Sequence, residues 1–368
     1  IASACIAARL KSVLPEIIHE DQKGFLPGRY IGENIRLVYD ILVHTETHNI
    51  PGLLLLIDFE KAFDSISWSF VQKSLDFFNF GPDIKRWVSV FYKNISASVS
   101  VNSGYSAWFN IERGVRQGDP LSPYLYLLCA EILSLLIREN NRIRGIRFGD
   151  DVEAMLSQFA DDTTIFLDGR KQSFEECVNV LNYFSSMSGL RMNFEKTNAV
   201  WIGSRKNSCV RYMPHLPIVW NPEVFKVLGI AFSTDVNNIV SFNYEKRIEN
   251  IRCILNSWKR RWLTPYGKIT VIKTLAISKI VHLLSCLPDP SVCFLNELNS
   301  LFYEFLWDSK PSKVNKSVVC CSYDRGGLRM LDVYAFVASL KISWLRRVFH
   351  IDSLLKKVLL CICPEMDR

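Results

Sequence analysis

The 368-residue sequence lacks any apolar run long enough to cross a membrane, and it lacks the cysteine spacing of a zinc-binding protein. Its most apolar stretches, 124–137 and 275–287, are interrupted by Glu131 and Lys279, whereas a spanning helix needs about 18 uncharged apolar residues. The eleven cysteines include no CxxC pair and no Cys/His cluster. We therefore expect no membrane span, no structural zinc site and free thiols in a reducing compartment.

Internal repeats and low-complexity tracts are also missing, so solenoid and fibrous architectures are excluded. The composition is 49% hydrophobic and 22% charged, which is typical of a folded globular protein. The net charge of +7 suits a polyanionic partner without requiring one. The first residue is Ile1 and no basic segment precedes an apolar one, so we expect a piece of a longer protein without a signal peptide.

Helical and extended patterns alternate up to about residue 232, and the remainder is almost wholly helical. The apolar run 53–57 predicts a strand buried on both faces that ends at Asp58. Residues 155–159 and 163–167 predict a β-hairpin with Asp161 and Asp162 at its tip. Other predicted elements are helices at 68–80, 83–92, 177–187 and 244–258, a hairpin around 102–104, and extended segments at 193–201 and 225–230.

Three carboxylates converge if the strand that ends at Asp58 pairs with the hairpin that carries Asp161 and Asp162. Such a cluster repels itself, so it persists only with bound cations or retained protons. Oxygen ligands without nearby His or Cys favour Mg²⁺, with Mn²⁺ as the alternative, and two such ions suit phosphoryl or nucleotidyl transfer. The simpler alternatives are that Asp58 caps the following helix and that Asp161 and Asp162 form a polar turn.

The segment Gly114–Pro123 (sequence GVRQGDPLSP) joins the predicted hairpin around 102–104 to an apolar helix. Its glycines expose backbone, and its arginine and glutamine supply polar groups, so the loop can approach a flat ligand closely. Alternatively, the segment is a helix entry in which Ser122 is the N-cap. The two interpretations use different atoms and are compatible.

Several motifs together resemble a reverse transcriptase of the non-LTR (LINE-like) retrotransposon class. They are DFEKAFDS from Asp58, QGDPLSP from Gln117 and FADD from Phe159, in this order. The resemblance extends back to Gln22–Arg29 and forward through GLRMNFEKT at 189–197 and FKVLGI at 225–230, and it reaches the FLWD and GGL motifs of the tail. It covers nearly the whole chain.

The resemblance implies a catalytic site with Asp58, Asp161 and Asp162 as the metal ligands for two Mg²⁺ ions. Lys196 would be a catalytic proton donor to the departing pyrophosphate, although a solvated lysine is the alternative. The implied nucleotide-binding residues are Phe59, Phe63, Arg116, Gln117 and Gly118. Phe63 would exclude a 2′-hydroxyl and so select deoxynucleotides, unless it is simply a core aromatic. Asp64 is interpreted as a helix N-cap.

Nucleic-acid contacts are implied by the same resemblance. They would come from Arg29 and from basic residues of a helical thumb, with Trp258 and Trp262 interleaved: Lys259, Arg260, Arg261, Lys268 and Lys273. The alternative is a solvated basic face on a helical bundle. The partners would be an RNA template, a DNA primer or target DNA, and deoxynucleoside triphosphates, with no membrane involved.

We therefore predict an α+β fold of the right-hand polymerase type, with a small antiparallel palm sheet. Residues 1–232 would form partial fingers and palm, 233–287 a helical thumb, and 288–368 a helical C-terminal extension. The predicted activity is RNA-directed DNA polymerisation, target-primed in the intact element. That activity would be intracellular, in the nucleus during synthesis and in the cytoplasm as a ribonucleoprotein.

Two rival hypotheses remain open from the sequence. Another palm-type nucleotidyl transferase, such as a nucleotide cyclase, needs the paired acids but has no use for Phe63, the Gln117 loop or a basic thumb. A catalytically inactive remnant that only binds nucleic acid would bind RNA without metal and make no product. The sequence alone does not give the retrotransposon clade, the target site or the oligomeric state.

Overall fold

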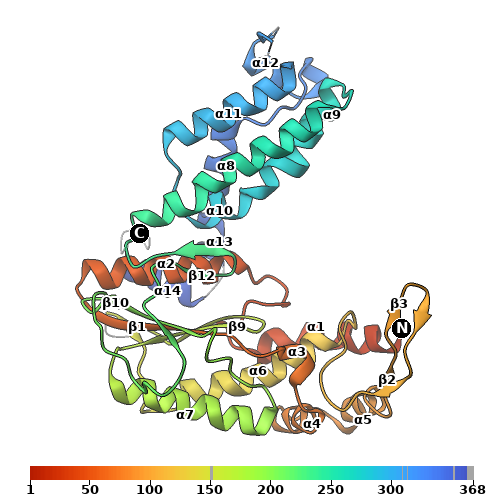
Figure 1. The fold of residues 1–368 in the computed structure, drawn as a ribbon, viewed down its shortest axis with the longest axis vertical. Coiled ribbons are helices and arrows are strands. Elements are labelled where there is room, and N and C mark those ends of the chain that lie inside the picture. The colour runs from red at the N-terminus through yellow and green to blue at the C-terminus, as the bar shows by residue number, and fades with distance from the viewer. Residues whose placement is uncertain (150–151, 309, 313, 351–352, 363–368) are drawn as a thin grey trace. The chain divides into compact units, whose positions relative to one another are not determined.

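The computed structural model describes residues 1–149, 152–308, 310–312, 314–350 and 353–362. The chain divides into two compact units, one of residues 1–223 together with 358–368 and one of residues 224–357. Both combine helices with strands (Figure 1), and the predicted α+β class is confirmed. In the described parts of the chain, no helix is both long and apolar enough to span a bilayer.

The first unit contains helices α1 to α7 and strands β1 to β11. Its helices are α1 (Ala2–Ile17), α2 (Ile31–Thr47), α3 (Ala62–Ser65), α4 (Trp68–Phe77), α5 (Pro82–Phe91), α6 (Ser122–Arg138) and α7 (Lys171–Ser188). Its strands are β1 (Pro51–Ile57), β2 (Ser96–Ala97), β3 (Ser100–Val101), β4 (Gly104–Tyr105), β5 (Phe109–Asn110), β6 (Ile146–Phe148), β7 (Val152–Ala154), β8 (Leu156–Phe159), β9 (Asp162–Leu167), β10 (Asn198–Gly203) and β11 (Val219–Trp220).

A five-stranded sheet in the order β11-β10-β1-β9-β8 forms the centre of this unit. Strand β1 pairs antiparallel with both β10 and β9, and only β10 and β11 are parallel. The central strand reads PGLLLLI because both of its faces are covered. Helices α6 and α7 lie on one face of the sheet and α2 on the other (Figure 1).

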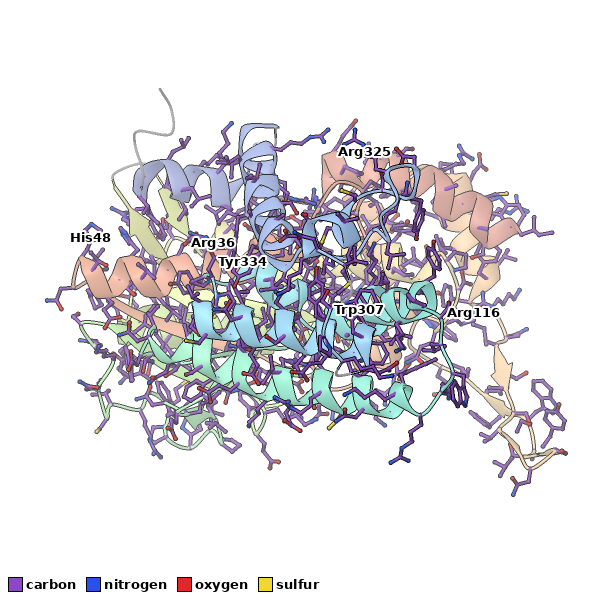
Figure 2. The ribbon with its side chains drawn as sticks, turned by 90° about the horizontal axis from the view of Figure 1, so that it is seen from above. Arg36, His48, Arg116, Trp307, Arg325 and Tyr334 are labelled. Carbon is purple, nitrogen blue, oxygen red and sulfur yellow. The ribbon has the colours of Figure 1, made fainter. Side chains whose placement is uncertain are left out.

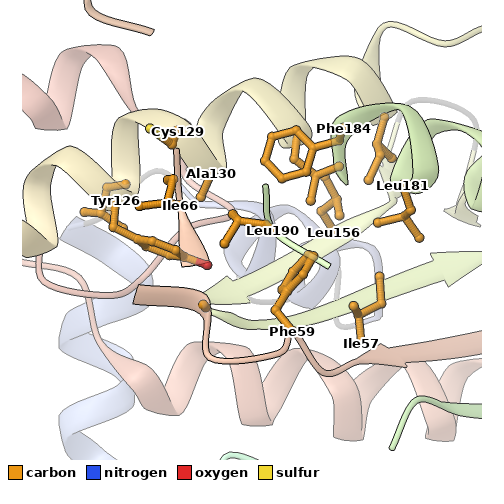
Figure 3. Packing of buried hydrophobic residues seen from close by; sticks show 14 of the residues in the cluster. Ile57, Phe59, Ile66, Tyr126, Cys129, Ala130, Leu156, Leu181, Phe184 and Leu190 are labelled. Carbon is orange, nitrogen blue, oxygen red and sulfur yellow. The ribbon is translucent and has the colours of Figure 1, made fainter. Parts of the chain in front are cut away.

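The hydrophobic core follows the two-residue alternation of β1. Leu53, Leu55 and Ile57 belong to the large buried cluster that also contains residues of α1, α4, α6 and α7. The buried Leu54 and Leu56 alternate to the opposite face. Figure 3 shows part of this cluster around Phe59. The strand is thereby fixed from both sides, which fixes the position of Asp58 at its end.

The second unit begins with a short hairpin and continues as helices. Its elements are β12 (Phe225–Val227), β13 (Ile230–Phe232), α8 (Asn238–Lys259), α9 (Pro265–Val271), a π-helical turn (Ile272–Ala276), a 3₁₀ turn (Ile277–Lys279), α10 (Val281–Cys286), α11 (Val292–Trp307), α12 (Lys316–Cys320), a 3₁₀ turn (Tyr323–Arg325), α13 (Val333–His350) and α14 (Leu354–Ile362), which crosses into the first unit's residues.

The compact units divide before the residue 232 boundary suggested by the sequence pattern. The side chain of Asn243 on α8 accepts from the N–H of Ala231 at 3.0 Å and donates to its carbonyl at 2.7 Å. These bonds tie the β12–β13 hairpin to α8, so the hairpin groups with the helices that follow it.

Candidate active site

The three predicted carboxylates lie at the adjoining ends of two paired strands. Ile57, the last residue of β1, pairs with Thr163 of β9, so Asp58 follows β1 beside the point where Asp162 begins β9. The backbone beyond Asp58 is held by a hydrogen bond from the Asn193 N–H to the Asp58 carbonyl at 2.8 Å. A bridge between Phe59 and Met192 continues this pairing. The predicted convergence of Asp58, Asp161 and Asp162 is therefore present in the backbone.

The carboxylates also interact electrostatically. Partial burial raises the pKa of Asp161, and the charge of Asp58 raises it further against an opposing backbone hydrogen bond. Burial raises the pKa of Asp162 as well, with added contributions from Asp161 and Asp58. Concentrated negative charge disfavours the ionised forms, and a bound cation reverses that effect. A cation bound at this cluster is therefore stabilised by the negative charge of the carboxylates.

The chemistry of this donor set fits a divalent cation that shares its coordination with a substrate. Carboxylate oxygens are the ligands that Mg²⁺ accepts. Within the described residues, no group of three His, Cys, Asp or Glu side chains is arranged to hold a metal alone. Mg²⁺ at phosphate-processing sites is usually held by one or two carboxylates plus substrate phosphates, so a complete protein cage is not required.

A buried glutamine clamps the hairpin that carries Asp161. The Gln22 side chain accepts from the Ala160 N–H at 2.8 Å and donates to the Ala160 carbonyl at 3.2 Å. The same oxygen accepts from the Gly24 N–H at 2.8 Å. Ala160 has a φ of 57°, a left-handed conformation that costs energy for a residue with a side chain. Gln22 therefore holds a strained turn one residue before Asp161.

The segment around Gln22 also extends the sheet. Gln22 forms a parallel bridge with Gln158 of β8, and the Lys23 N–H donates to the Gln158 carbonyl at 2.8 Å. A Cβ at Gly24 would lie 2.6 Å from the Ala160 nitrogen, so only glycine fits beside the hairpin tip. Gln22 belongs to the segment Gln22–Arg29, which is part of the family resemblance seen in the sequence. No local sequence pattern indicates its contact with Ala160.

Phe63 lies in the short helix α3 between two other aromatic rings. Its ring stacks on Tyr126 of α6 with centroids 4.5 Å apart, and Phe25 meets it edge-on at 6.3 Å. Phe63 is half-buried, whereas Phe25 is exposed. The role of Phe63 in selecting nucleotides stays a prediction, and its ring is stacked on Tyr126 while remaining partly exposed.

Tyr126 connects this aromatic group to the acids, and sequence reasoning missed it. Burial raises the pKa of the Tyr126 phenol well above its ordinary value, with the negative charge of Asp161 as the next cause. Figure 3 shows its ring among the buried side chains of α6. Tyr126 lies in a helix of mostly apolar residues, so its position signals core packing and nothing about its hydroxyl.

The glycine-containing loop is attached to α3 by its backbone. The Val115 N–H donates to the Phe63 carbonyl at 2.7 Å, and the Trp68 indole donates to the Gly114 carbonyl at 2.7 Å. Gly114 has a φ of +86°, and a Cβ there would lie 2.6 Å from the Asp64 carbonyl oxygen. This close approach explains the glycine and brings the loop beside Phe63.

Gln117 and Gly118 lie at the exposed part of this loop. The Gln117 amide donates to the Asp64 carboxylate at 3.3 Å. The predicted N-cap role of Asp64 is therefore wrong, because α3 begins after Lys61 and α4 after Ser67. Gly118 has a φ of +84° with open space where a Cβ would be.

Arg116 supports the base of the loop. Its guanidinium donates to the Phe91 carbonyl at 3.1 Å and lies 5.5 Å from the centre of the Tyr92 ring. Figure 2 labels Arg116 among the side chains of the molecule. The predicted N-cap at Ser122 is also wrong: α6 begins at Ser122 itself, after Leu121. The Asp119 carboxylate instead accepts from the Leu121 N–H at 2.9 Å, which satisfies the entry to the helix.

Arg29 and Lys196 occupy very different surroundings. The Arg29 guanidinium donates to the carbonyls of Ile18, His19 and Gln22 at 2.5–2.6 Å and to that of Pro15 at 3.3 Å. The Arg29 guanidinium thus satisfies backbone carbonyls at the C-terminal end of α1. A nucleic-acid phosphate would have to bind the same guanidinium while these hydrogen bonds are in place. Lys196 is exposed on the turn before β10, where the sequence predicted an extended segment.

The predicted thumb residues belong to the second unit, and most lie on its surface. Lys259, Arg260, Arg261 and Lys273 are exposed, and Arg261 lies 4.3 Å from the centre of the Trp258 ring. Trp262 is fully exposed. Lys268 is a correction: it is buried and its ammonium lies 2.5 Å from the Asp308 carboxylate, so it holds α9 to the end of α11.

The family model described as reverse transcriptase (RNA-dependent DNA polymerase) matches residues 1–232. The chain therefore belongs to the reverse transcriptase family. The 149 kDa protein of transposon TX1 from Xenopus laevis is 30% identical over 359 residues, which is 96% of this chain and 27% of that protein. The Pol polyprotein of the type-2 retrotransposable element R2DM from Drosophila melanogaster is 27% identical and covers 89% of this chain and 31% of its own length.

These relatives identify the chain more narrowly as a reverse transcriptase segment of the non-LTR retrotransposon kind. The chain spans about a third of the length of the retrotransposon proteins that it matches. Among solved structures, telomerase from Candida albicans aligns with 97% of this chain and 54% of its own, at 13% identity and a TM-score of 0.49.

Proposed function

We propose that this chain carries the RNA-directed DNA polymerase activity of a non-LTR retrotransposon. It would extend a primer by attack of the 3′-hydroxyl on the α-phosphate of a deoxynucleoside triphosphate, with RNA as template. The observation that carries the proposal is the meeting of Asp58, Asp161 and Asp162 at the adjoining ends of β1 and β9. Acids so placed are unfavourable alone and favourable beside cations.

Asp58 and Asp161 would hold two Mg²⁺ ions, with Asp162 as a third carboxylate beside them. When bound, such ions lower the pKa of an attacking hydroxyl and neutralise charge on the leaving phosphates. The chain's own contribution is to fix the two acids: β1 is buried on both faces, and Gln22 holds the turn before Asp161. Preorganised charge of this kind acts without reorganisation during the reaction.

The other predicted residues would bind and orient the nucleotide. The Phe63 ring, backed by Tyr126, would lie under the sugar and exclude a 2′-hydroxyl. Gln117 and Gly118 would contact the base pair that forms, beside Phe59. Lys196 would donate a proton to the departing pyrophosphate. The exposed residues Lys259, Arg260, Arg261 and Lys273 would follow the phosphates of the template–primer duplex.

In the intact element we propose that synthesis is primed from nicked target DNA, as the resemblance implies. That reaction would take place in the nucleus, after transit of a ribonucleoprotein from the cytoplasm. The partners are then the RNA template, the DNA primer and deoxynucleoside triphosphates. All of these concern the longer protein of which this chain covers a part.

Primer extension on an RNA template tests the proposal. We expect Asp161→Asn to lower the extension rate by roughly 10³-fold or more, because removing a charge that stabilises the transition state costs several kcal/mol. Asp83→Asn is the matched control, since Asp83 is exposed on α5 outside the site, and it should leave the rate unchanged.

Extension that survives both Asp58→Asn and Asp161→Asn would contradict the assignment of these acids. If the unaltered chain binds RNA in the absence of metal and never extends a primer, the inactive binding remnant is the better description. Cyclic nucleotide formation without a template would instead favour the cyclase alternative.

A further inference from the structure

A cavity rich in arginine opens in the first unit, at the end of β1 opposite to Asp58. It has a volume of about 470 Å³, and its lining comes from the start of β1, the segment before and within β6, the β9–α7 connection and the end of β10. Its ten lining residues are Ile50, Pro51, Arg144, Gly145, Ile146, Arg147, Asp168, Gly169, Arg170 and Arg205. Residues 52–57 of β1 separate the cavity from Asp58, a distance of roughly 20 Å along a strand.

The four arginines of the cavity differ in the contacts that their side chains make within the protein. Arg205 donates to the Gly169 carbonyl at 2.8 Å and lies 5.3 Å from the centre of the Trp201 ring, and Arg170 pairs with Asp168 at 3.2 Å. Arg144 and Arg147 are exposed, and neither has an ion-pair partner among the residues that the structure describes. Arg205 is thus held by the protein, Arg170 is paired with Asp168 at the surface, and Arg144 and Arg147 remain available to a ligand.

Asp168 is the one acidic residue among those that line the cavity, and Glu153 lies next to the lining without belonging to it. The Asp168 carboxylate accepts from the Arg170 N–H at 3.0 Å in addition to its ion pair, and Glu153 accepts from the Gly145 N–H at 2.6 Å. The N-terminus of the 18-residue helix α7 begins at Lys171, directly after Arg170. Its free N–H groups and dipole add to the positive potential of the arginines. The site has a surplus of positive charge.

We infer that this cavity binds backbone phosphates of a single-stranded RNA segment outside the active site. Planar guanidinium groups match phosphate oxygens in pairs, which explains arginine rather than lysine. The volume exceeds that of a single phosphate group, and the lining from four separate chain segments suits a strand that passes through it. No exposed aromatic ring lines the cavity, so the contacts would be independent of base sequence.

This inference rests on the proposed function, because it assigns the bound strand to the RNA that the enzyme copies. RNA held at the far end of β1 would be kept on the protein while a short stretch is copied at the acids. Binding at the cavity does not itself require catalysis. The two proposals can therefore fail separately.

The test measures affinity for a 20-nucleotide single-stranded RNA as a function of salt. The variant Arg144→Ala/Arg147→Ala should bind about tenfold more weakly at low salt. The slope of log affinity against log salt concentration should become shallower by roughly one for each lost phosphate contact. The matched control is Arg9→Ala/Arg86→Ala, which removes the same charge from exposed positions on α1 and α5. Its affinity should fall by less than about twofold.

A second arm distinguishes the source of the phosphate. Inorganic triphosphate at concentrations that saturate a nucleotide site should leave RNA bound to the unaltered chain. Equal losses in the two double variants would overturn the inference, because general charge would then explain the binding. Displacement of RNA by triphosphate in the unaltered chain, absent in Arg144→Ala/Arg147→Ala, would overturn it in favour of a small-anion site.

Primer extension on a template too short to reach the cavity separates this inference from the function. Arg144→Ala/Arg147→Ala should keep the rate of the unaltered chain there, and its unfolding temperature should match that of the control. If no form of the chain extends primers but RNA binding still depends on Arg144 and Arg147, the polymerase proposal fails and the cavity assignment stands. A chain that binds no RNA at low salt contradicts both.

Discussion

Gln22 connects the N-terminal part of the chain to the acidic hairpin through one side chain. Its amide is buried and makes three hydrogen bonds to backbone, two of them to Ala160. A hydrogen bond to a buried partner contributes little when made and costs much when one partner is removed. The turn that precedes Asp161 therefore depends on a buried side chain that lies 138 residues earlier in the sequence.

We expect Gln22→Ala to destabilise the protein by about 1–3 kcal/mol, because the N–H and carbonyl of Ala160 lose their partners. Primer extension should also fall at temperatures where the variant is folded, since Asp161 is no longer held. Denaturant unfolding and extension rates measure the two effects. Gln72→Ala is the control, because that amide makes one long bond of 3.5 Å. Equal stability of the two variants would show that the clamp is dispensable.

A substitution at Phe63 tests whether its ring selects deoxynucleotides. We expect Phe63→Val to increase the use of ribonucleotides relative to deoxynucleotides by about tenfold or more, because a smaller side chain leaves room for a 2′-hydroxyl. Competitive incorporation of the two nucleotide types measures the ratio. Phe78→Val is a matched control, since Phe78 is also a half-buried aromatic packed on this core. An unchanged ratio would leave Phe63 as a core aromatic.

The sequence predicts some of these residues and misses others for a physical reason. Asp58 and Asp161 follow apolar runs that predict strands, so the pairing of those strands is enough to predict that the two residues lie close together. Gln22 hydrogen-bonds to Ala160, which lies 138 residues later, and Tyr126 lies at a position that the helical pattern assigns to the core. Long-range hydrogen bonds leave no periodic signal in a sequence.

Among the elements, α2 covers the face of the sheet opposite to α6, and it carries a buried histidine. The ring of His44 stacks on Phe148 of β6 at 4.3 Å, and His48 lies one turn further on. Burial lowers the pKa of His44, and the charge of His48 lowers it further. Helix α2 therefore packs best when His44 is neutral.

This pKa shift predicts a loss of stability in mild acid. Below the ordinary histidine pKa of about 6.5 the unfolded chain gains a proton that folded His44 resists, so stability falls as pH decreases from that value toward the lowered pKa. We expect His44→Phe, which keeps the stacked ring, to flatten the profile between about pH 6.5 and 5. Unfolding by denaturant across this range measures it. His215→Phe, at an exposed position, should keep the slope of the unaltered chain.

Helices and strands of high apolar content are predicted well, whereas boundaries set by capping are not. The 53–57 run and the hairpin at 155–167 form as predicted because their burial patterns are local. The predicted extended segment at 193–201 begins instead with a turn, because the Asn193 N–H and carbonyl bond to Asp58 and Thr197. The N-cap prediction for Ser122 failed because the Asp119 carboxylate already accepts from the Leu121 N–H at the entry to α6. The prediction for Asp64 failed because α3 begins before it, after Lys61.

At the scale of the whole molecule, the residues with predicted roles are distributed over two compact units. The first holds the acids, the aromatic group and the arginine cavity, all arranged around one sheet. The second holds the exposed basic residues and is mainly helical. The family model ends at residue 232, so it covers residues 1–223 of the first unit and the short hairpin of the second. Burial of Lys268 could not be read from charge alone, because its partner Asp308 lies 40 residues later.

The bridge between Gln22 and Gln158 also determines how far the chain can be shortened. With residues 21–23 in place, the N–H and carbonyl of Gln158 on the outer side of β8 are hydrogen-bonded to the Asp21 carbonyl and the Lys23 N–H. A version that begins after Gly24 would leave the N–H and carbonyl of Gln158 unpaired at the edge of the sheet, and unpaired edge groups promote pairing between molecules. Aggregation, rather than a simple loss of activity, is then the expected defect of such a truncation.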